Sequence, residues 1–488
     1  MRKIAIIGGG FGGIAAAIRL RARGNQVTIY DRLNKLGGRA QVFQRKNYIH
    51  DAGPTVITAP NLFYELFSLL GENLEDSLEF KPLDPWYRFH FNDQTDFDYG
   101  PDRENMLDQI REISPVDVSG YLNMLKESEA IFKLGYEKLA GHPFSRIATM
   151  IRYAPAIIKM RGYQSVFSFV SRHLQHPNLR QAFSIQPLLV GGNPFKTSSI
   201  YSLIHALEQK WGIYFCMGGT GKLVSELEKL MIRNGIKINY NSDVSHFSTI
   251  GKVITRVNFK NRKSESYDYV VSNADPVQVS GELLKNEKIS FHNYLIKKYA
   301  KHSMGLFVLF FGSVKSYKNI AHHTIWMGPR YKELLKDIFD RHHLAEDFSI
   351  YLHRPTRTDP SFAPKNQDSY YALVPVPNLK GNQNWDEIKE SFSKKILDEL
   401  DKTIMPGIVK NAREIFSMTP KDFKENYRTP FGSGFSIAPI LSQSAWFRTH
   451  NQDDRYKNLF YVGAGTHPGA GVPGVINSAK VVEKIMYP

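Results

Sequence analysis

The segment "IAIIGGGFGG" (residues 4–13), near the start of the chain, constrains the fold most strongly. Its first four residues form a short, continuously apolar run, which is typical of a strand buried on both faces of a parallel sheet. Gly8, Gly10 and Gly13 follow with the G-x-G-x-x-G spacing, and residues 14–20 are good helix formers. The segment therefore predicts a buried strand, a tight glycine turn and a helix.

A second strand and an acidic residue complete this pattern. The predicted helix ends at Gly24, residues 27–30 form another strand-like run, and Asp31 follows 18 positions after Gly13, close to the expected spacing of about 20 residues. Glycine lets the backbone approach a pyrophosphate at the helix N-terminus, and the acid accepts hydrogen bonds from ribose hydroxyls. The pattern predicts a dinucleotide-binding unit, and the glycines disfavour a secretion signal because they interrupt the apolar run.

Length and cysteine content limit the possible domain organisation and the possible disulfide and metal sites. A chain of 488 residues predicts two domains, or a nucleotide domain with a large insertion. The single cysteine, Cys216, excludes an intramolecular disulfide and every cysteine-cluster metal site, suits a reducing compartment and is expected to be buried. No apolar stretch reaches the roughly 18 residues that a membrane-spanning helix needs.

The histidine pattern does not predict a metal site. The pairs His322-His323 and His342-His343 lack the i, i+4 helical spacing with a nearby carboxylate that metal-binding helices show. We expect core or solvated histidines and no metal. No G-x-S-x-G nucleophile motif is present either.

The charge distribution is uneven. Lys and Arg number 63 against 47 Asp and Glu, giving a net charge of +16, and residues 138–207 contain no acidic residue. Nucleic-acid binding is disfavoured because no recognition helix or stacking motif is visible. A basic, aromatic, amphipathic segment instead suits an anionic membrane surface, although an ordinary helical domain without acids is the alternative. We expect the segment 144–172 to lie on a membrane and to insert Ile147, Met150, Ile151, Ile157, Ile158 and Phe167.

A second glycine pair identifies the nucleotide. Gly37, Gly38 and Arg39 place two glycines and a cation near the same pyrophosphate, as in flavin enzymes of the two-dinucleotide-binding type. The other glycine-rich turn, "MGGTGKL" (residues 217–223), lacks this spacing, and we expect no strand before it. The sequence therefore predicts one FAD and no built-in NAD(P)H site.

The C-terminal residues 463–474 are rich in glycine and lie between a predicted strand (459–462) and a predicted helix that starts near Pro473. Proline is favoured at a helix start, and the N-terminus of this helix would offer free N–H groups and partial positive charge. Aimed at the flavin pyrimidine, they would stabilise the negative charge that develops when a hydride arrives.

The chain resembles the bacterial phytoene desaturase family over nearly its whole length. The resemblance is carried by "DAGPTVIT" (51–58), "SIYSLIHALEQKWGIYFCMGGTGKLV" (199–224), "VVSNADP" (270–276), "GSGFSIAPILSQSAWFRTHN" (432–451) and "NLFYVGAGTHPGAGVPGVINSAK" (458–480). It implies a peripheral membrane flavoprotein that transfers hydride from phytoene to FAD and forms lycopene or neurosporene.

The resemblance also sets the expected partners and the alternatives. It implies a hydrophobic polyene substrate, oxygen or quinone as electron acceptor, no nucleic acid, and a cytoplasmic location on the inner face of the cell membrane. Alternatives are a C30 dehydrosqualene desaturase, a hydroxyneurosporene dehydrogenase or a carotenoid isomerase, an amine oxidase of the same fold, and a flavin-free lipid carrier. No catalytic acid or base is identified from the sequence.

The expected fold is α/β. It consists of a Rossmann-like FAD-binding domain of the amine-oxidase-like, two-dinucleotide-binding type, and an inserted mixed-sheet and helical domain for substrate and membrane. We expect residues 1–70, 210–290 and 430–488 in the FAD-binding domain. Residues 71–209 and 291–429 would form the substrate-binding domain, with its membrane-associating helices around 138–207.

The expected cofactor-binding residues come from the glycine motifs, the acid and the segments of the resemblance. They are Gly8, Gly10, Phe11, Gly12, Gly13, Asp31, Arg32, Gly37, Gly38, Arg39, Gly53, Pro54, Thr55, Val244, Asn273, Ala274, Gly463, Ala464, Gly465, His467, Pro473, Gly474 and Val475.

Overall fold

The computed structural model describes all residues from 1 to 488. One part of it is built around a five-stranded sheet, in the spatial order β10-β2-β1-β13-β19, whose strands are all parallel. The strands are β1 (Lys3–Ile7), β2 (Gln26–Tyr30), β10 (Lys237–Asn239), β13 (Tyr269–Ser272) and β19 (Leu459–Tyr461). The predicted strands at 4–7, 27–30 and 459–462 are confirmed, and distant parts of the chain meet in one sheet.

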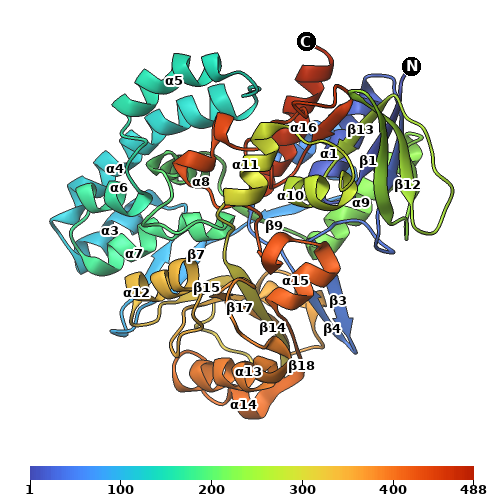
Figure 1. The fold of residues 1–488 in the computed structure, drawn as a ribbon. Coiled ribbons are helices and arrows are strands. Elements are labelled where there is room, and N and C mark those ends of the chain that lie inside the picture. Colours follow the sequence, from blue (N-terminus) through green and yellow to red (C-terminus); the bar gives the residue numbers. More distant parts are fainter.

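Three helices pack around this sheet in a shared apolar core: α1 (Phe11–Ala22), α9 (Gly219–Arg233) and α16 (Val472–Met486). The first and last helices of the chain lie side by side, so the two termini emerge close together (Figure 1). A guanidinium N–H of Arg19 in α1 donates to the Glu483 carboxylate in α16 over 3.0 Å, and both side chains are buried. The C-terminus is therefore a structural part of the nucleotide fold.

A mixed seven-stranded sheet forms the second part, in the order β18-β14-β17-β16-β15-β7-β8. Its strands are β7 (Tyr87–His90), β8 (Asp96–Tyr99), β14 (Gly305–Ser313), β15 (His323–Trp326), β16 (Ile350–His353), β17 (Asp368–Val376) and β18 (Ala412–Met418). Along β14, Phe307, Leu309 and Phe311 face the core with α13 (Trp385–Lys402), while alternate residues face the helical part. Because both faces of β14 are covered, its sequence is continuously apolar.

A helical part covers the other face of that sheet. It contains α3 (Arg103–Ile113), α4 (Asp117–Phe132), α5 (Ile147–Lys159), α6 (Val166–His173), α7 (Pro177–Ser184) and α8 (Leu203–Trp211), with short helices η3 (Gln186–Val190) and η4 (Ser199–Ser202). In Figure 1, α5 stands at the top of this part, away from the sheet. None of the helices combines the length and the apolar character needed to cross a bilayer.

Smaller elements join these parts. They are the antiparallel pairs β3 (Val42–Arg45) with β4 (Tyr48–Asp51) and β11 (Val244–Ile250) with β12 (Val253–Phe259), the three-stranded sheet of β5 (Ile57–Thr58), β9 (Ile213–Cys216) and β6 (Phe80–Pro82), and the helices α2 (Asn61–Ser68), α10 (Pro276–Gln278), α11 (Phe291–Tyr299), α12 (Tyr331–Lys336), α14 (Ile408–Asn411) and α15 (Pro420–Tyr427). Cys216 ends β9 and is buried, as expected.

Candidate functional site

The glycine turn sits between β1 and α1, at the carboxyl end of the parallel sheet. Gly8 has φ = +93°, a conformation that favours glycine. A Cβ atom at Gly13 would overlap the carbonyl oxygen of Gly8, so Gly13 is needed for close packing of helix on strand. Gly10 is the N-cap of α1 and supplies no side-chain cap. The first N–H groups of the helix therefore remain available to an anion.

Asn273, directly after β13, fills the centre of this turn. A Cβ at Gly10 would lie 2.9 Å from its Nδ2, and a Cβ at Gly12 or Gly463 would lie 2.6 Å or 2.5 Å from its Oδ1. These positions therefore need glycine because a larger residue would clash with the Asn273 side chain, whether or not a ligand is bound. This contact joins the N-terminal, middle and C-terminal parts of the chain at one point.

Asp31 and Arg39 are two of the charged residues that line the site. The Asp31 carboxylate accepts the N–H of Gly9 at 2.7 Å and of Leu33 at 2.8 Å. Burial raises its pKa, and these two backbone donors partly offset the effect. The Arg39 Nε is shielded from solvent and has no hydrogen-bond partner. A cation held in this way fits a pyrophosphate, because a buried donor without a partner is costly.

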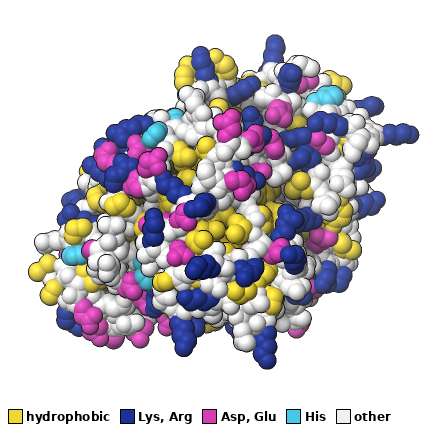
Figure 2. All heavy atoms as spheres, turned by 90° about the horizontal axis from the view of Figure 1, so that it is seen from below, with side chains coloured by type: hydrophobic (Ala, Val, Ile, Leu, Met, Phe, Trp, Pro, Cys, Tyr) yellow, Lys and Arg dark blue, Asp and Glu magenta, His cyan; other side chains and the backbone are white.

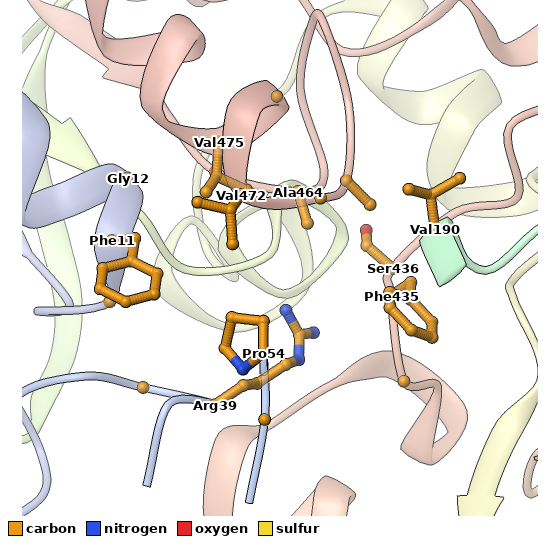
Figure 3. A pocket seen from close by; sticks show the side chains of 18 of the residues that line it. Phe11, Gly12, Arg39, Pro54, Val190, Phe435, Ser436, Ala464, Val472 and Val475 are labelled. Carbon is orange, nitrogen blue, oxygen red and sulfur yellow. The ribbon is translucent and has the colours of Figure 1, made fainter. Parts of the chain in front are cut away.

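The C-terminal loop closes the site from the opposite side. Figure 3 shows Arg39 and Pro54 facing Val472 and Ala464 across the cavity. The buried Arg448 holds this loop, donating to the carbonyl oxygens of Ala464 at 2.6 Å and Thr466 at 3.1 Å. The N-cap of α16 is Gly471, again without a side-chain cap. A second uncapped helix N-terminus therefore points toward the same space.

The predicted cofactor-binding residues are brought together: all of them except Gly13 line one cavity, which we call the main cavity. Its volume is about 630 Å³. Val244, the first residue of β11, reaches this cavity, and His467 lines it with a pKa that burial lowers to about 3, so its imidazole is neutral. The donor set fits FAD: Arg39 and the α1 N-terminus suit the pyrophosphate, and Asp31 suits a ribose.

The second glycine-rich turn, at residues 217–223, differs from expectation. A strand, β9, does precede it and α9 follows, so the prediction that no strand precedes this turn was wrong. However, β9 lies in the small antiparallel sheet, and the N-terminus of α9 is occupied by the Asp51 carboxylate of the chain itself. The Thr220 N–H and hydroxyl donate to Asp51 at 3.1 Å and 2.9 Å. An internal acid takes the position that a phosphate would need.

Beyond the nucleotide residues, the main cavity becomes apolar. Its walls there come from η3, η4, α8 and β14, with side chains such as Leu188, Leu189, Ile200, Leu203, Ile204, Leu207, Leu306 and Val308. Ile157 of α5 also lines it, as does Ala445 of η11 (Ala445–Phe447). The cavity thus extends from the glycine turn to the surface helices around α5.

Two polar groups in this apolar region were not found from the sequence. Glu208 of α8 is fully buried; its Oε2 accepts the Tyr99 hydroxyl at 3.0 Å, while its Oε1 has no partner. The hydroxyl of Tyr87 also has no partner, and both residues line the cavity. Burial raises the pKa of Glu208 to about 8, although Tyr99 and Gln186 lower it in part. A lone Glu in an amphipathic helix gives no signal of such burial.

The histidine pairs have different surroundings. His322 and His323 are buried, as expected for core histidines, and His353 of β16 joins them. His343 is exposed and His342 is half-buried. Neither pair lines the main cavity.

Comparison with known proteins places this chain in a family. A family model described as flavin containing amine oxidoreductase matches residues 11–482. The chain is 44% identical over 487 residues to "Phytoene desaturase (lycopene-forming)" of Pantoea ananas, covering 100% of this chain and 99% of that protein. It is 38% identical over 485 residues to "Phytoene desaturase (neurosporene-forming)" of Cereibacter sphaeroides, covering 98% and 93%.

A solved structure shows the same fold. An oxidoreductase from Methanosarcina mazei superposes with a TM-score of 0.68 at 16% sequence identity, covering 100% of both chains. The expected fold, with its parallel nucleotide sheet and mixed second sheet, is confirmed. The chain belongs to the flavin containing amine oxidoreductases and, among them, to the bacterial carotenoid desaturases, and it is an FAD-dependent oxidoreductase.

Proposed function

We propose that this protein desaturates phytoene and forms lycopene. The observation that carries the proposal is the main cavity, in which a charged nucleotide end continues into a long apolar region. A hydrocarbon offers no charge or hydrogen bond, so only such a lining can position it. The full-length identity to a lycopene-forming relative supports this product, and neurosporene is the alternative.

The residues that line the charged end are proposed to hold FAD. The α1 N-terminus, Gly37, Gly38 and Arg39 would contact the pyrophosphate, Asp31 a ribose, and Val244 the adenine. Pro54, Thr55 and the 463–475 loop would surround the flavin ring. The proposed domain division is supported by the sheets: the five parallel strands lie within 1–70, 210–290 and 430–488, and the seven-stranded sheet lies within 71–209 and 291–429.

Glu208 is proposed to accept the proton of the reaction. When bound, FAD supplies the hydride acceptor. Converting CH₂–CH₂ into CH=CH releases one hydride and one proton, and the proton requires a base in the apolar region. Glu208 has a free oxygen there, and its raised pKa, about 8, gives the carboxylate a high proton affinity. Turnover should rise with pH toward 8, because only the ionised carboxylate can accept a proton.

The activity is tested in cells that accumulate phytoene. Expression of the protein, followed by pigment analysis, should yield lycopene; accumulation of neurosporene would change the assigned product, and unchanged phytoene would contradict the function. The same assay with a C30 precursor separates the C30 alternative, and anaerobic assays with added quinone distinguish the two acceptors. Glu208→Gln should lose most turnover while retaining FAD, whereas the exposed Glu137→Gln should not.

We also propose that the protein rests on the inner face of the cell membrane through what we call the α5 face: α5, η11 and α11. No residue of α5 is buried, and Ile151 and Ile158 are 66% and 63% exposed. Phe291, at the start of α11, is 75% exposed. The elements contact one another, η11 and α11 through Trp446 and His292 with ring centroids 5.4 Å apart.

The proposed α5 face differs from the membrane segment predicted from the sequence. Ile157 lines the main cavity and Phe167 packs on Phe195 with centroids 4.3 Å apart, so neither is free to enter a bilayer as expected. Cations alone do not mark the face, because Figure 2, seen from the end away from α5, also shows Lys and Arg spread among acids. The α5 face differs from other faces because its exposed apolar side chains lie beside a wall of the main cavity. A substrate that dissolves only in lipid would enter the cavity from the membrane at such a place.

The membrane proposal is tested by charge reversal. Replacing Arg152, Lys159 and Arg161 by Glu should reduce sedimentation with anionic liposomes and slow conversion of liposome-embedded phytoene, with normal FAD content. The matched control replaces Lys394, Lys402 and Lys410 by Glu at the opposite end, on α13 and α14. If both triple variants bind liposomes like the parent, the entrance lies elsewhere.

A further inference from the structure

Three buried histidines converge where β15 and β16 meet. His323 begins β15, His353 ends β16, and the antiparallel register places them directly opposite each other. His322 precedes β15 by one residue. All three side chains are buried, and one ring nitrogen from each lies within 4.8 Å of those of the other two.

The hydrogen bonds of the cluster leave several ring nitrogens without partners. The Nδ1 atoms of His322 and His323 bond the hydroxyls of Thr358 at 2.6 Å and Tyr351 at 2.8 Å. The Nε2 atoms of both residues, and both ring nitrogens of His353, have none. Buried polar atoms are almost always paired, so a group of unpaired nitrogens calls for a bound water or ion.

We propose that His322, His323 and His353 form a binding site for a divalent transition metal such as Zn²⁺. Histidines that bind metals through one ring nitrogen usually bond a neighbour through the other, which is the arrangement of His322 and His323 here. Neutral imidazole is the form that binds metals, and all three rings are buried away from solvent.

The three histidine nitrogens are farther apart than they would be around a bound zinc ion. Tetrahedral zinc with Zn–N distances of about 2.0–2.1 Å separates its nitrogens by roughly 3.3 Å, so the histidine nitrogens must move together on binding. Arg354 is near, but its charge is paired with Asp368 at 3.0 Å. His322 also lines a separate cavity of about 220 Å³ with Asp84, Arg88 and Thr358, which provides an access route.

The metal would have a structural role. It would join β15, β16 and the residue before β15, and it would fix the tautomer of His323 that bonds Tyr351. Tyr351 in turn lies 3.2 Å from Thr55 Oγ1, and both line the main cavity. The metal site would thus fix the positions of Tyr351 and Thr55 in the lining of the main cavity without contacting the substrate.

The test is metal analysis of the holoenzyme, purified without a histidine tag. After incubation with ZnSO₄ and desalting, the parent should retain about one zinc per chain by mass spectrometry, and the chelator EDTA should lower its Tm. His353→Phe, which keeps an aromatic ring, should lose the zinc and the EDTA effect with unchanged FAD content. The matched control, His342→Gln with His343→Gln, should retain both.

The result for the parent protein alone can overturn the proposal. A parent protein that retains no zinc and no Co²⁺, and whose Tm is indifferent to EDTA, overturns the proposal and assigns the cluster to bound water. Zinc that persists in His353→Phe places the metal elsewhere and overturns it too.

Discussion

Replacing Glu208 by Gln should remove a pH dependence of stability. The pKa of Glu208 is about 8 in the folded protein, against an ordinary value of 4.5. Between these values the folded state keeps a proton that the unfolded state releases, so stability falls as pH rises through this window. The loss is complete above about pH 8. Glutamine has nearly the same shape and does not titrate.

The magnitude follows from linkage. Each pH unit within the window costs about 1.4 kcal/mol, so the full shift from 4.5 to about 8 corresponds to roughly 5 kcal/mol. Between pH 6 and pH 8 the loss is about 2 kcal/mol, because the folded state begins to release the proton near pH 8. Glu208 is fully buried, so solvent screening does not reduce this figure.

The assay is urea unfolding of the parent, Glu208→Gln and the control Glu137→Gln at pH 6, 7 and 8. The difference in unfolding free energy between Glu208→Gln and the parent should grow by about 2 kcal/mol from pH 6 to pH 8. Histidines and other titrating groups affect all three proteins alike and cancel in this difference. Parallel pH profiles for the parent and Glu208→Gln would refute the argument, as would absence of a protonated carboxyl band in the infrared difference spectrum at pH 6.

Three further changes test the nucleotide site. Gly10→Val should give colourless apoprotein, because its Cβ would lie 2.9 Å from Asn273 Nδ2 and its methyls would enter the pyrophosphate space; flavin absorbance of the purified protein checks this. Deletion from Gly463 onward should abolish FAD binding, since it removes α16 from its contact with α1, and a yellow truncated protein would contradict it. Arg448→Met should weaken FAD binding by about tenfold or more, because it removes charge-assisted bonds to the 463–467 loop; titration of apoprotein with FAD measures the change.

The nucleotide part was predictable because its signals are local. Gly8, Gly13 and Asp31 belong to one strand–turn–helix–strand unit, in which spacing alone determines which groups meet. The sequence of β14 carries a signal of the same local kind, because a strand covered on both faces is almost entirely apolar. Such features depend on neighbours within about thirty residues.

The missed features depend on pairing between distant segments. His353 lies opposite His323 only because β15 and β16 are antiparallel neighbours in this register, and helical spacing rules do not describe a cross-strand pair. Glu208 in α8 is buried where β8 packs against this helix, and its hydrogen-bond partner Tyr99 lies 109 residues earlier in the chain. The strand before the 217–223 turn was missed because β9 pairs only with the distant β5 and β6. No single-sequence periodicity reports these encounters.

The spatial order of the parallel sheet has a consequence for synthesis. β1 is made first, yet one of its two neighbours, β13, follows more than 260 residues later, and the edge strand β19 and helix α16 come from the last thirty residues. At about 5–20 residues per second, a ribosome needs on the order of half a minute to two minutes to supply them. During that time the apolar edge of β1 and the face of α1 are open to solvent or to a chaperone. We therefore expect tight FAD binding only after β19 and α16 have been made, because they complete the nucleotide part.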